Sequence, residues 1–297
     1  MKKIFLLTIL FVALSKFSIL SQTVIEIKPL FEYPVAPANL ESLEDKCNYL
    51  MKNFWNDFDF KIKQPLDQHA LNEAFSVYVT PMQYADKKEV DQSIDKLLNK
   101  ISGNPILSFQ FTIAAEENLY GPRADYWNEE IYLKFVDALV KNKKVKDSRK
   151  TKYLNQANAL RHSNVGNSAP SFQFLDKNGN VKNYFPMSTP TLLIFGDPED
   201  TDWRLSRLKL DSNFVLEEAI NKGKVNILYI IPEGKNNWQQ AISNYSSKWT
   251  VGSSSDISDK YDTRVNPSIY IIGSDGKIQN KLAKIEPAIE IILQTVN

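Results

Sequence analysis

The chain has 297 residues, of which 43% are hydrophobic and 24% charged, and its formal net charge is +1. This composition is that of a globular protein with packed cores, and the length is sufficient for two domains. A nucleic-acid-binding protein would carry a strongly basic balance, so we expect no nucleic acid partner.

The first residues, MKKIFLLTILFVALSKFSILSQ, have the pattern of a secretory signal peptide. Lys2 and Lys3 precede the apolar run 4–14, and small residues follow it. We predict a signal peptide at 1–21, cleaved after Ser21, and export to the periplasm, with an extracellular location as the alternative. The apolar run is shorter than the roughly 20 residues that cross a bilayer. We therefore expect no transmembrane segment in the mature chain.

The segment 22–163 is predicted to be an all-α domain of about five helices, because apolar residues recur there at helical spacing. The predicted helices cover 40–54, 90–101, 106–120 and 128–141. The chain has a single cysteine, Cys47, so it can form no internal disulfide. Cys47 lies on the apolar stripe of the first helix, where we expect a buried and unreactive thiol.

From Asn164 onward the pattern changes to short strands, turns and helices. Turns at Asn178-Gly179 and Asp275-Gly276 predict two hairpins. The other predicted elements, in chain order, are a buried strand at 191–195, a helical region at 202–222, a strand at 225–231, a helix at 236–247 and a terminal helix at 287–296. This order predicts an α/β sandwich with a mixed central sheet at 164–297, so the whole chain is predicted to be α + α/β.

Four stretches of this second half are distinctive, namely VGNSAPSF at 165–172, TPTLLIF at 189–195, YDTRVNPSIY at 261–270 and GSDGKI at 273–278. They resemble the exported branch of thioredoxin-like proteins related to TlpA and ResA. The resemblance implies a thioredoxin-like fold in which Pro267 is the cis-proline. It also implies that the residues after Phe195 form the corner that carries the catalytic cysteines in such enzymes.

Further motifs are Asp197-Pro198-Glu199, KLDSN at 209–213, NKGKV at 221–225 and IPEG at 231–234. On these motifs the chain more closely resembles a Bacteroidota family of exported proteins that join a helical domain of unknown function to a C-terminal thioredoxin-like domain. With the signal peptide and the change of pattern at Asn164, this predicts a signal peptide at 1–21, a helical domain at 22–163 that resembles the domain of unknown function, and a thioredoxin-like domain at 164–297.

The corner itself departs from this family. Many relatives read Asp-Pro-x-Cys-x-x-Cys, whereas here Asp200 and Trp203 stand where the two cysteines would be. Disulfide exchange needs a thiolate nucleophile and a second thiol that resolves the mixed disulfide. A carboxylate and an indole supply neither, so we predict a redox-inactive protein with no catalytic residues and no cofactor.

The corner is rich in acids, because Asp197, Glu199, Asp200 and Asp202 follow one another closely. One interpretation is a site for a hard cation such as Ca²⁺. The other is capping of the following helix, whose first N–H groups and dipole favour carboxylates. We favour capping and predict no metal, because the alternating ligands and central glycine of a calcium loop are missing.

The resemblance implies that the corner and the cis-proline loop lie side by side and bind extended peptide. Asp197, Asp200, Trp203, Asn266 and Pro267 would then belong to a groove that pairs with peptide backbone. For Trp203 two alternatives stand, an exposed binding anchor or a side chain packed beneath the first helical turn.

We therefore predict a binding protein whose partner is an envelope protein or an extended peptide. The alternatives are an enzyme, either related to thiol–disulfide oxidoreductases or an acid-based hydrolase, and a structural component of an envelope assembly. The oligomeric state stays open.

Overall fold

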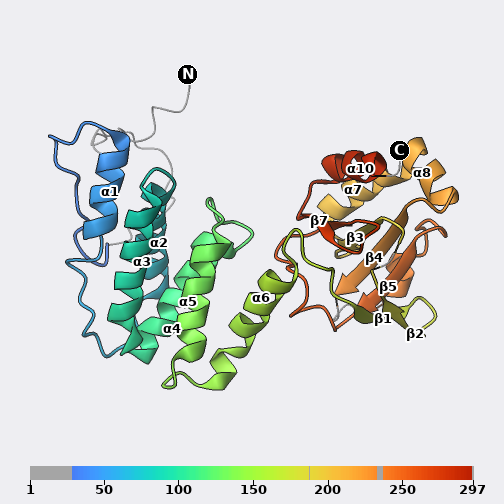
Figure 1. Cartoon of the computed structure of the whole chain (residues 1–297). Helices are drawn as coiled ribbons and strands as arrows, with labels where there is room; N and C mark the ends of the chain where they lie inside the picture. The colour runs from blue at the N-terminus through green and yellow to red at the C-terminus, as the bar shows by residue number, and fades with distance from the viewer. Residues whose placement is uncertain (1–28, 187, 233–236, 296–297) are drawn as a thin grey trace, which may run out of the picture.

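The structure, a computed structural model, describes residues 29–186, 188–232 and 237–295. The predicted signal peptide at 1–21 lies outside the described residues. An N-terminal helical region and a C-terminal α/β domain stand side by side in Figure 1. The predicted fold class is confirmed. Within the described residues, no helix combines the length and the apolar character needed to cross a membrane.

The helical region contains six α-helices among the described residues. They are α1 (Leu43–Asn53), α2 (Gln68–Val79), α3 (Lys87–Ser102), α4 (Pro105–Ala115), α5 (Glu129–Lys141) and α6 (Thr151–His162). Three short elements accompany them, namely the 3₁₀ turns η2 (Thr80–Gln83) and η4 (Asp147–Arg149) and the π-helix η3 (Glu116–Tyr120). The four predicted helices correspond to α1, α3, α4 with η3, and α5, whereas α2 and α6 were not delineated from the sequence.

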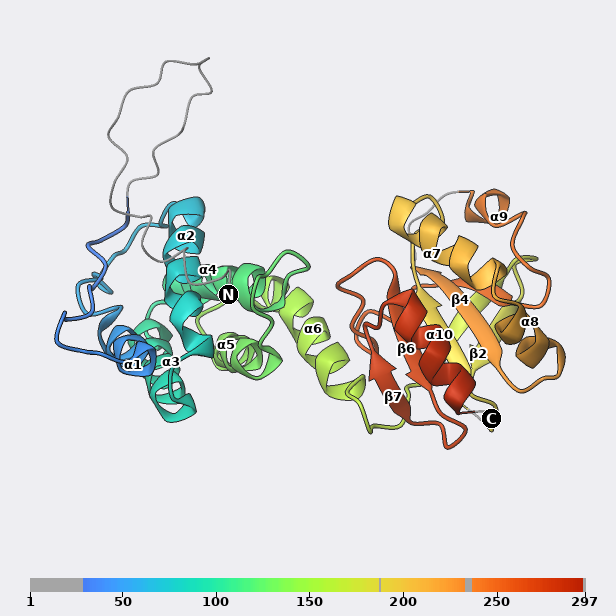
Figure 2. The ribbon, with the colours of Figure 1, turned by 90° about the horizontal axis from the view of Figure 1, so that it is seen from above.

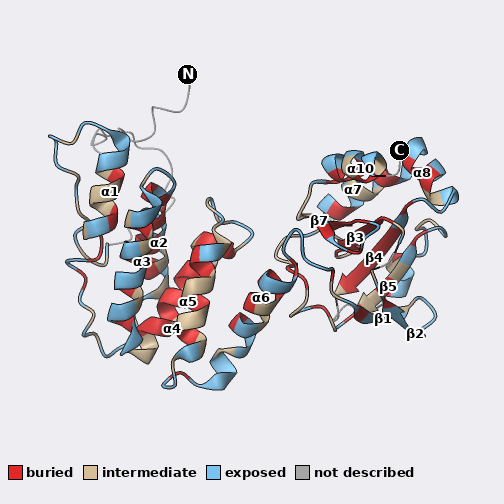
Figure 3. Cartoon of the chain, in the orientation of Figure 1, coloured by how far each residue is buried: buried red, intermediate tan, exposed pale blue. Residues whose placement is uncertain are grey.

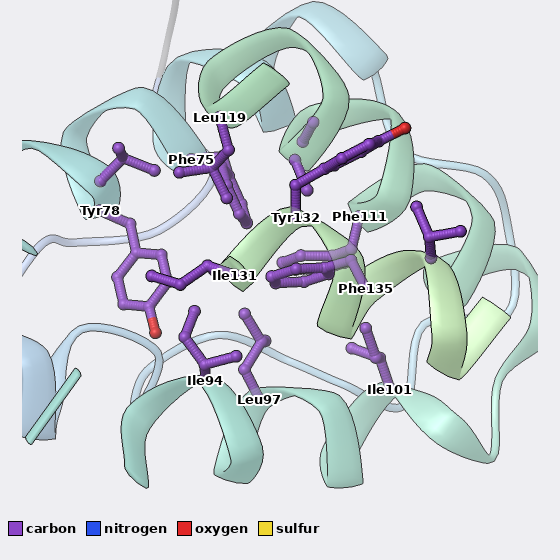
Figure 4. Close-up of a cluster of buried hydrophobic side chains, with 14 of the residues drawn as sticks. Phe75, Tyr78, Ile94, Leu97, Ile101, Phe111, Leu119, Ile131, Tyr132 and Phe135 are labelled. Carbon is purple, nitrogen blue, oxygen red and sulfur yellow. The ribbon is translucent and has the colours of Figure 1, made fainter. Parts of the chain in front are cut away.

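Polar side chains fix where these helices begin. Ser42, Asp67, Asn104 and Asn128 each accept a hydrogen bond from a backbone N–H in the first turn of the helix that follows. Their apolar faces then meet in one core, in which aromatic rings from α2, α4 and α5 gather (Figure 4). The region is therefore held by packing, with no disulfide.

The C-terminal domain is built on a seven-stranded sheet. Its strands are β1 (Phe172–Asp176), β2 (Val181–Tyr184), β3 (Thr191–Phe195), β4 (Asn226–Pro232), β5 (Thr250–Ser254), β6 (Ser268–Ile272) and β7 (Ile278–Lys281), in the order β2-β1-β5-β4-β3-β6-β7. The helices are α7 (Thr201–Asp211), α8 (Phe214–Asn221), α9 (Trp238–Ala241) and α10 (Ile285–Gln294). β3 pairs in parallel with β4 and antiparallel with β6, so the sheet is mixed, as predicted.

The central strands are buried on both faces, which explains their continuous apolar sequence (Figure 3). Alternate residues of β3 point to opposite sides. Leu192 and Ile194 join the core beneath α7, α8 and α10, whereas Leu193 and Phe195 join a second core with Tyr261. The sheet thus forms a rigid platform whose end carries the loops of the candidate site.

Three elements differ from the sequence prediction. β5, TVGSS, was missed, because its short polar sequence has little apolar alternation and gains its identity only by pairing between β1 and β4. The predicted helical region 202–222 is two helices, because Asn213 caps α8. The predicted helix at 236–247 is only the four-residue α9.

Seen from above, α6 extends from the helical bundle toward the side of the C-terminal domain that carries β6 and β7 (Figure 2). The end of α6 contacts that domain, since Nδ1 of His162 lies 3.1 Å from the carbonyl oxygen of Asp259.

Candidate functional site

The candidate site forms where β3 ends and β6 begins. Phe195, the last residue of β3, is paired with Ser268, the first residue of the antiparallel β6. The loop that follows β3 and the loop that precedes β6 therefore meet at the same end of the sheet. The Asn266–Pro267 peptide bond is cis, as the resemblance implies.

A direct hydrogen bond joins the two loops. The backbone N–H of Asp197 donates to Oδ1 of Asn266 over 3.0 Å. Gly196 permits this approach, because a Cβ there would lie 3.3 Å from that same oxygen and 3.3 Å from Cε2 of Tyr229. Four of the predicted site residues, Asp197, Asp200, Asn266 and Pro267, are thus placed on two neighbouring loops.

Two acids of the corner accept backbone N–H groups. Asp200 is the N-cap of α7, and its Oδ1 accepts the N–H of Trp203 at 3.0 Å, which matches the capping interpretation. Oδ1 of Asp197 accepts the N–H of Glu199, also at 3.0 Å, in the loop before the helix. In the part of the chain that the structure describes, no group of three or more His, Cys, Asp or Glu side chains could hold a metal ion.

Trp203 is fully buried, so the second of the two alternatives holds and the assignment of Trp203 to the groove is corrected. Its ring stacks on Tyr229, with the ring centroids 4.4 Å apart and the planes inclined by 9°. Its Nε1–H donates to the hydroxyl of Tyr245 over 2.6 Å. The first turn of α7 directs this side chain down onto β4, because position 203 lies on the inner face of the helix.

The sequence analysis did not identify Tyr229 and Tyr245 as partners of this position. The aromatic residue in the apolar run of β4 was the available signal for Tyr229. Tyr245 lies outside any helix or strand, so its contact with Trp203 follows only from the tertiary fold.

Trp203, which the resemblance places where a second cysteine would be, is therefore part of the hydrophobic core. The only thiol of the chain, Cys47, belongs to α1 in the helical region and is 5% exposed. Burial raises the pKa of the Cys47 thiol, which disfavours the reactive thiolate. The corner consequently has no group that performs disulfide exchange.

The loop before β6 contains backbone groups without a hydrogen-bond partner among the described residues. Asn266 is exposed and Pro267 is half-buried. Neither the N–H nor the C=O of Asn266 is hydrogen-bonded to another described residue, since only its side chain is engaged. A cleft of about 350 Å³ lies on the other side of the corner, lined by Asp197, Pro198, Glu199, Asn237, Trp238, Gln240 and Ala241.

Exposed apolar side chains lie on the helix that leaves the corner and on the helix that follows it. Leu205 and Leu208 of α7 are more than half exposed, and so are Phe214 and Val215 at the start of α8, with Phe214 at 81%. Large exposed apolar side chains of this kind are typical of protein-binding surfaces when they are contiguous.

Solved structures share this architecture. A thioredoxin-like protein from Bacteroides caccae matches with a TM-score of 0.62 and 17% identity, over 89% of this chain and 98% of that chain. The thioredoxin domain of a thiol-disulfide oxidoreductase from Bacteroides vulgatus matches with a TM-score of 0.40 and 19% identity, over 45% of this chain and 99% of its own. No curated protein matched the chain in a sequence comparison.

The fold and the corner thus define a thioredoxin-like protein with a helical N-terminal region and without a Cys-x-x-Cys pair. At this level of identity the structural likeness shows the fold alone. The family membership of the chain is shown by its N-terminal half. Residues 14–163 match the domain of unknown function DUF5106, and the chain belongs to that family.

Proposed function

We propose that this protein is an exported, redox-inactive binding protein that holds an extended segment of an envelope protein against the loop before β6. The observation that carries the proposal is the state of Asn266. Asn266 is an exposed residue whose backbone N–H and C=O have no hydrogen-bond partner among the described residues, while its side chain accepts a hydrogen bond from the corner. An extended peptide that pairs with these two groups would gain main-chain hydrogen bonds, as in other cases of strand addition.

The surroundings suit a protein partner. The hydrogen bond from the backbone N–H of Asp197 holds the side chain of Asn266 in place, which lowers the entropic cost of binding. Exposed apolar side chains also lie on α7, the helix that leaves the corner. The absence of the cysteine pair from the sequence removes thiol chemistry but leaves these features in place.

The test begins with the full chain as bait for crosslinking capture from envelope extract. Asn266→Arg places a bulky charge beside the unpaired backbone groups, and Asn178→Arg makes the same change in an exposed turn of the β1–β2 hairpin. We expect capture of one partner by the parent chain and by Asn178→Arg, and a loss of roughly tenfold or more with Asn266→Arg.

A synthetic peptide from the crosslinked segment of that partner then allows the affinity to be measured by fluorescence anisotropy. On peptide binding, the Asn266 amide should become protected from hydrogen exchange. Equal capture by the parent chain and both variants would place the interface elsewhere and refute the proposed groove.

A further inference from the structure

Arg264 lies two residues before Asn266, buried in the contact between the helical region and the thioredoxin-like domain, with a side chain that is 1% exposed. Its Nη2 donates to Oε1 of Glu129 over 2.5 Å, and its Nη1 donates to the carbonyl of Tyr120 over 3.3 Å. Its Nε donates to Oδ2 of Asp262 over 2.8 Å. The guanidinium therefore has partners in both parts of the molecule.

Aromatic rings of the helical region enclose the same guanidinium. Its central carbon lies 4.2 Å from the ring centroid of Tyr120 and 4.9 Å from that of Trp127. The Tyr120 ring is itself stacked on Tyr132, and its hydroxyl donates to Oδ1 of Asp262 over 3.1 Å. A planar guanidinium both stacks and forms a fork of hydrogen bonds, which lysine does not do.

Asp262, the acidic partner on the thioredoxin-like side, is fully buried and fixed from several directions. Its backbone N–H donates to Oγ of Ser163 over 3.2 Å, and its carbonyl accepts the hydroxyl of Tyr270 over 2.7 Å. On the helical side, the carboxylate of Glu129 also accepts Nζ of Lys281 over 2.7 Å. These contacts link the end of α6, α5, β6 and β7 through one network.

We propose that this network is an interdomain latch, in which Tyr120, Trp127 and Glu129 of the helical region hold Arg264 and thereby fix the conformation of the loop 262–267. Two residues separate Arg264 from Pro267, so a guanidinium held in place leaves Asn266 little freedom. Undocking of the helical region would release the loop.

The latch makes docking of the helical region a regulator of the candidate groove, and this second step rests on the proposed function. A partner that binds the ordered loop then favours the docked arrangement, and docking favours partner binding to the same extent. Arg264 is in this sense a positioning residue that does not itself contact the partner.

The test uses hydrogen–deuterium exchange of the full chain and changes only the helical side. Trp127→Ala and Glu129→Gln, alone and combined, leave the Arg264–Asp262 pair intact, and Lys281 keeps its hydrogen bond to Asn164. Tyr84→Ala is the control, because Tyr84 is a similarly exposed aromatic residue of the helical region, at 48% against 42% for Trp127.

We expect amides of 262–268 to exchange roughly tenfold faster in the double variant, because it loses the cation–π contact of Trp127 and the two ion pairs that Glu129 forms with Arg264 and Lys281. Amides of β3 should keep the rate of the parent chain, and Tyr84→Ala should change neither segment. An unchanged rate at 262–268 would overturn the latch, and so would an equal acceleration of β3, which would mean general destabilisation.

Arg264→Lys provides an independent check, because it keeps the positive charge but loses the stacked fork. We expect faster exchange at 262–268 in this variant as well, and wild-type rates there would overturn the role given to the guanidinium. The exchange readout needs no partner, so the latch can stand even if the groove binds nothing. Conversely, a captured peptide that binds the double variant as tightly as the parent chain would refute the coupling while leaving the groove in place.

Discussion

Replacement of Trp203 by alanine separates the two roles that this position could have. The indole is fully buried against Tyr229 and lies beneath the first turn of α7, so its removal leaves a large cavity under the corner. Truncation of a buried Phe or Trp to Ala costs about 3–5 kcal/mol. Trp203→Phe keeps an aromatic ring and loses the hydrogen bond to Tyr245 and part of the volume, so a cost of about 1–2 kcal/mol is expected.

The free energy of unfolding of the C-terminal domain is best followed inside the full chain, because the two parts need not unfold together. Hydrogen exchange of the β3 amides reports it directly, and urea denaturation gives a second measure. Phe214→Ala is the matched control. It removes an aromatic ring that is 81% exposed, so a change within about 0.5 kcal/mol is expected.

A loss of less than about 1 kcal/mol for Trp203→Ala would refute the packing argument. If such a variant folded normally but no longer captured a partner, Trp203 would instead be an exposed binding anchor.

Three further outcomes follow from the same structure. Asp200→Ala should destabilise α7 by about 1 kcal/mol through loss of the N-cap, whereas Asp200→Asn should stay within about 0.5 kcal/mol in urea unfolding. The Cys47 thiol should resist a thiol reagent such as DTNB in the folded protein and react in urea, and rapid labelling without denaturant would contradict its burial. Burial alone would raise the pKa of Glu129, but Lys281 and Arg264 outweigh it and lower that pKa below its usual value of about 4.3. The contribution of Glu129 to stability is therefore present above that value and is lost as the pH falls through the lower pKa of the folded state. The difference in thermal stability between the parent chain and Glu129→Gln should consequently shrink from about pH 6 to about pH 3, and a constant difference would contradict this reasoning.

The features of the fold that depend only on neighbouring residues in the chain can be predicted from the sequence. The apolar run 191–195, the Asn178-Gly179 turn and the cap residue Asp200 specify a strand, a hairpin and a helix start by local chemistry alone. β5 could not be predicted in this way, because a polar pentapeptide becomes a strand only when β1 and β4 lie beside it.

In the candidate site too, some features follow from local motifs and others depend on the tertiary fold. The positions of the corner and of Pro267 follow from motifs, so the two loops could be predicted to meet. The burial of Trp203 depends on the facing Tyr229 and Tyr245, residues 26 and 42 positions away, and no pattern around 203 encodes it. The partners of Arg264 are more distant still, since Tyr120 and Glu129 belong to the other half of the chain.

The Arg264 network also bears on why the two halves are joined in a particular orientation. Burial of an arginine between two carboxylates has a large desolvation cost. Apolar side chains of similar volume at the same positions often stabilise a protein equally well or better. Stability alone therefore does not account for the network. A guanidinium that must satisfy Glu129, Asp262 and the Tyr120 carbonyl at once accepts one arrangement of the two parts, whereas an apolar contact tolerates sliding. Such geometric selectivity is what a loop that presents Asn266 to a partner requires, because backbone pairing depends on the direction of the N–H and C=O groups.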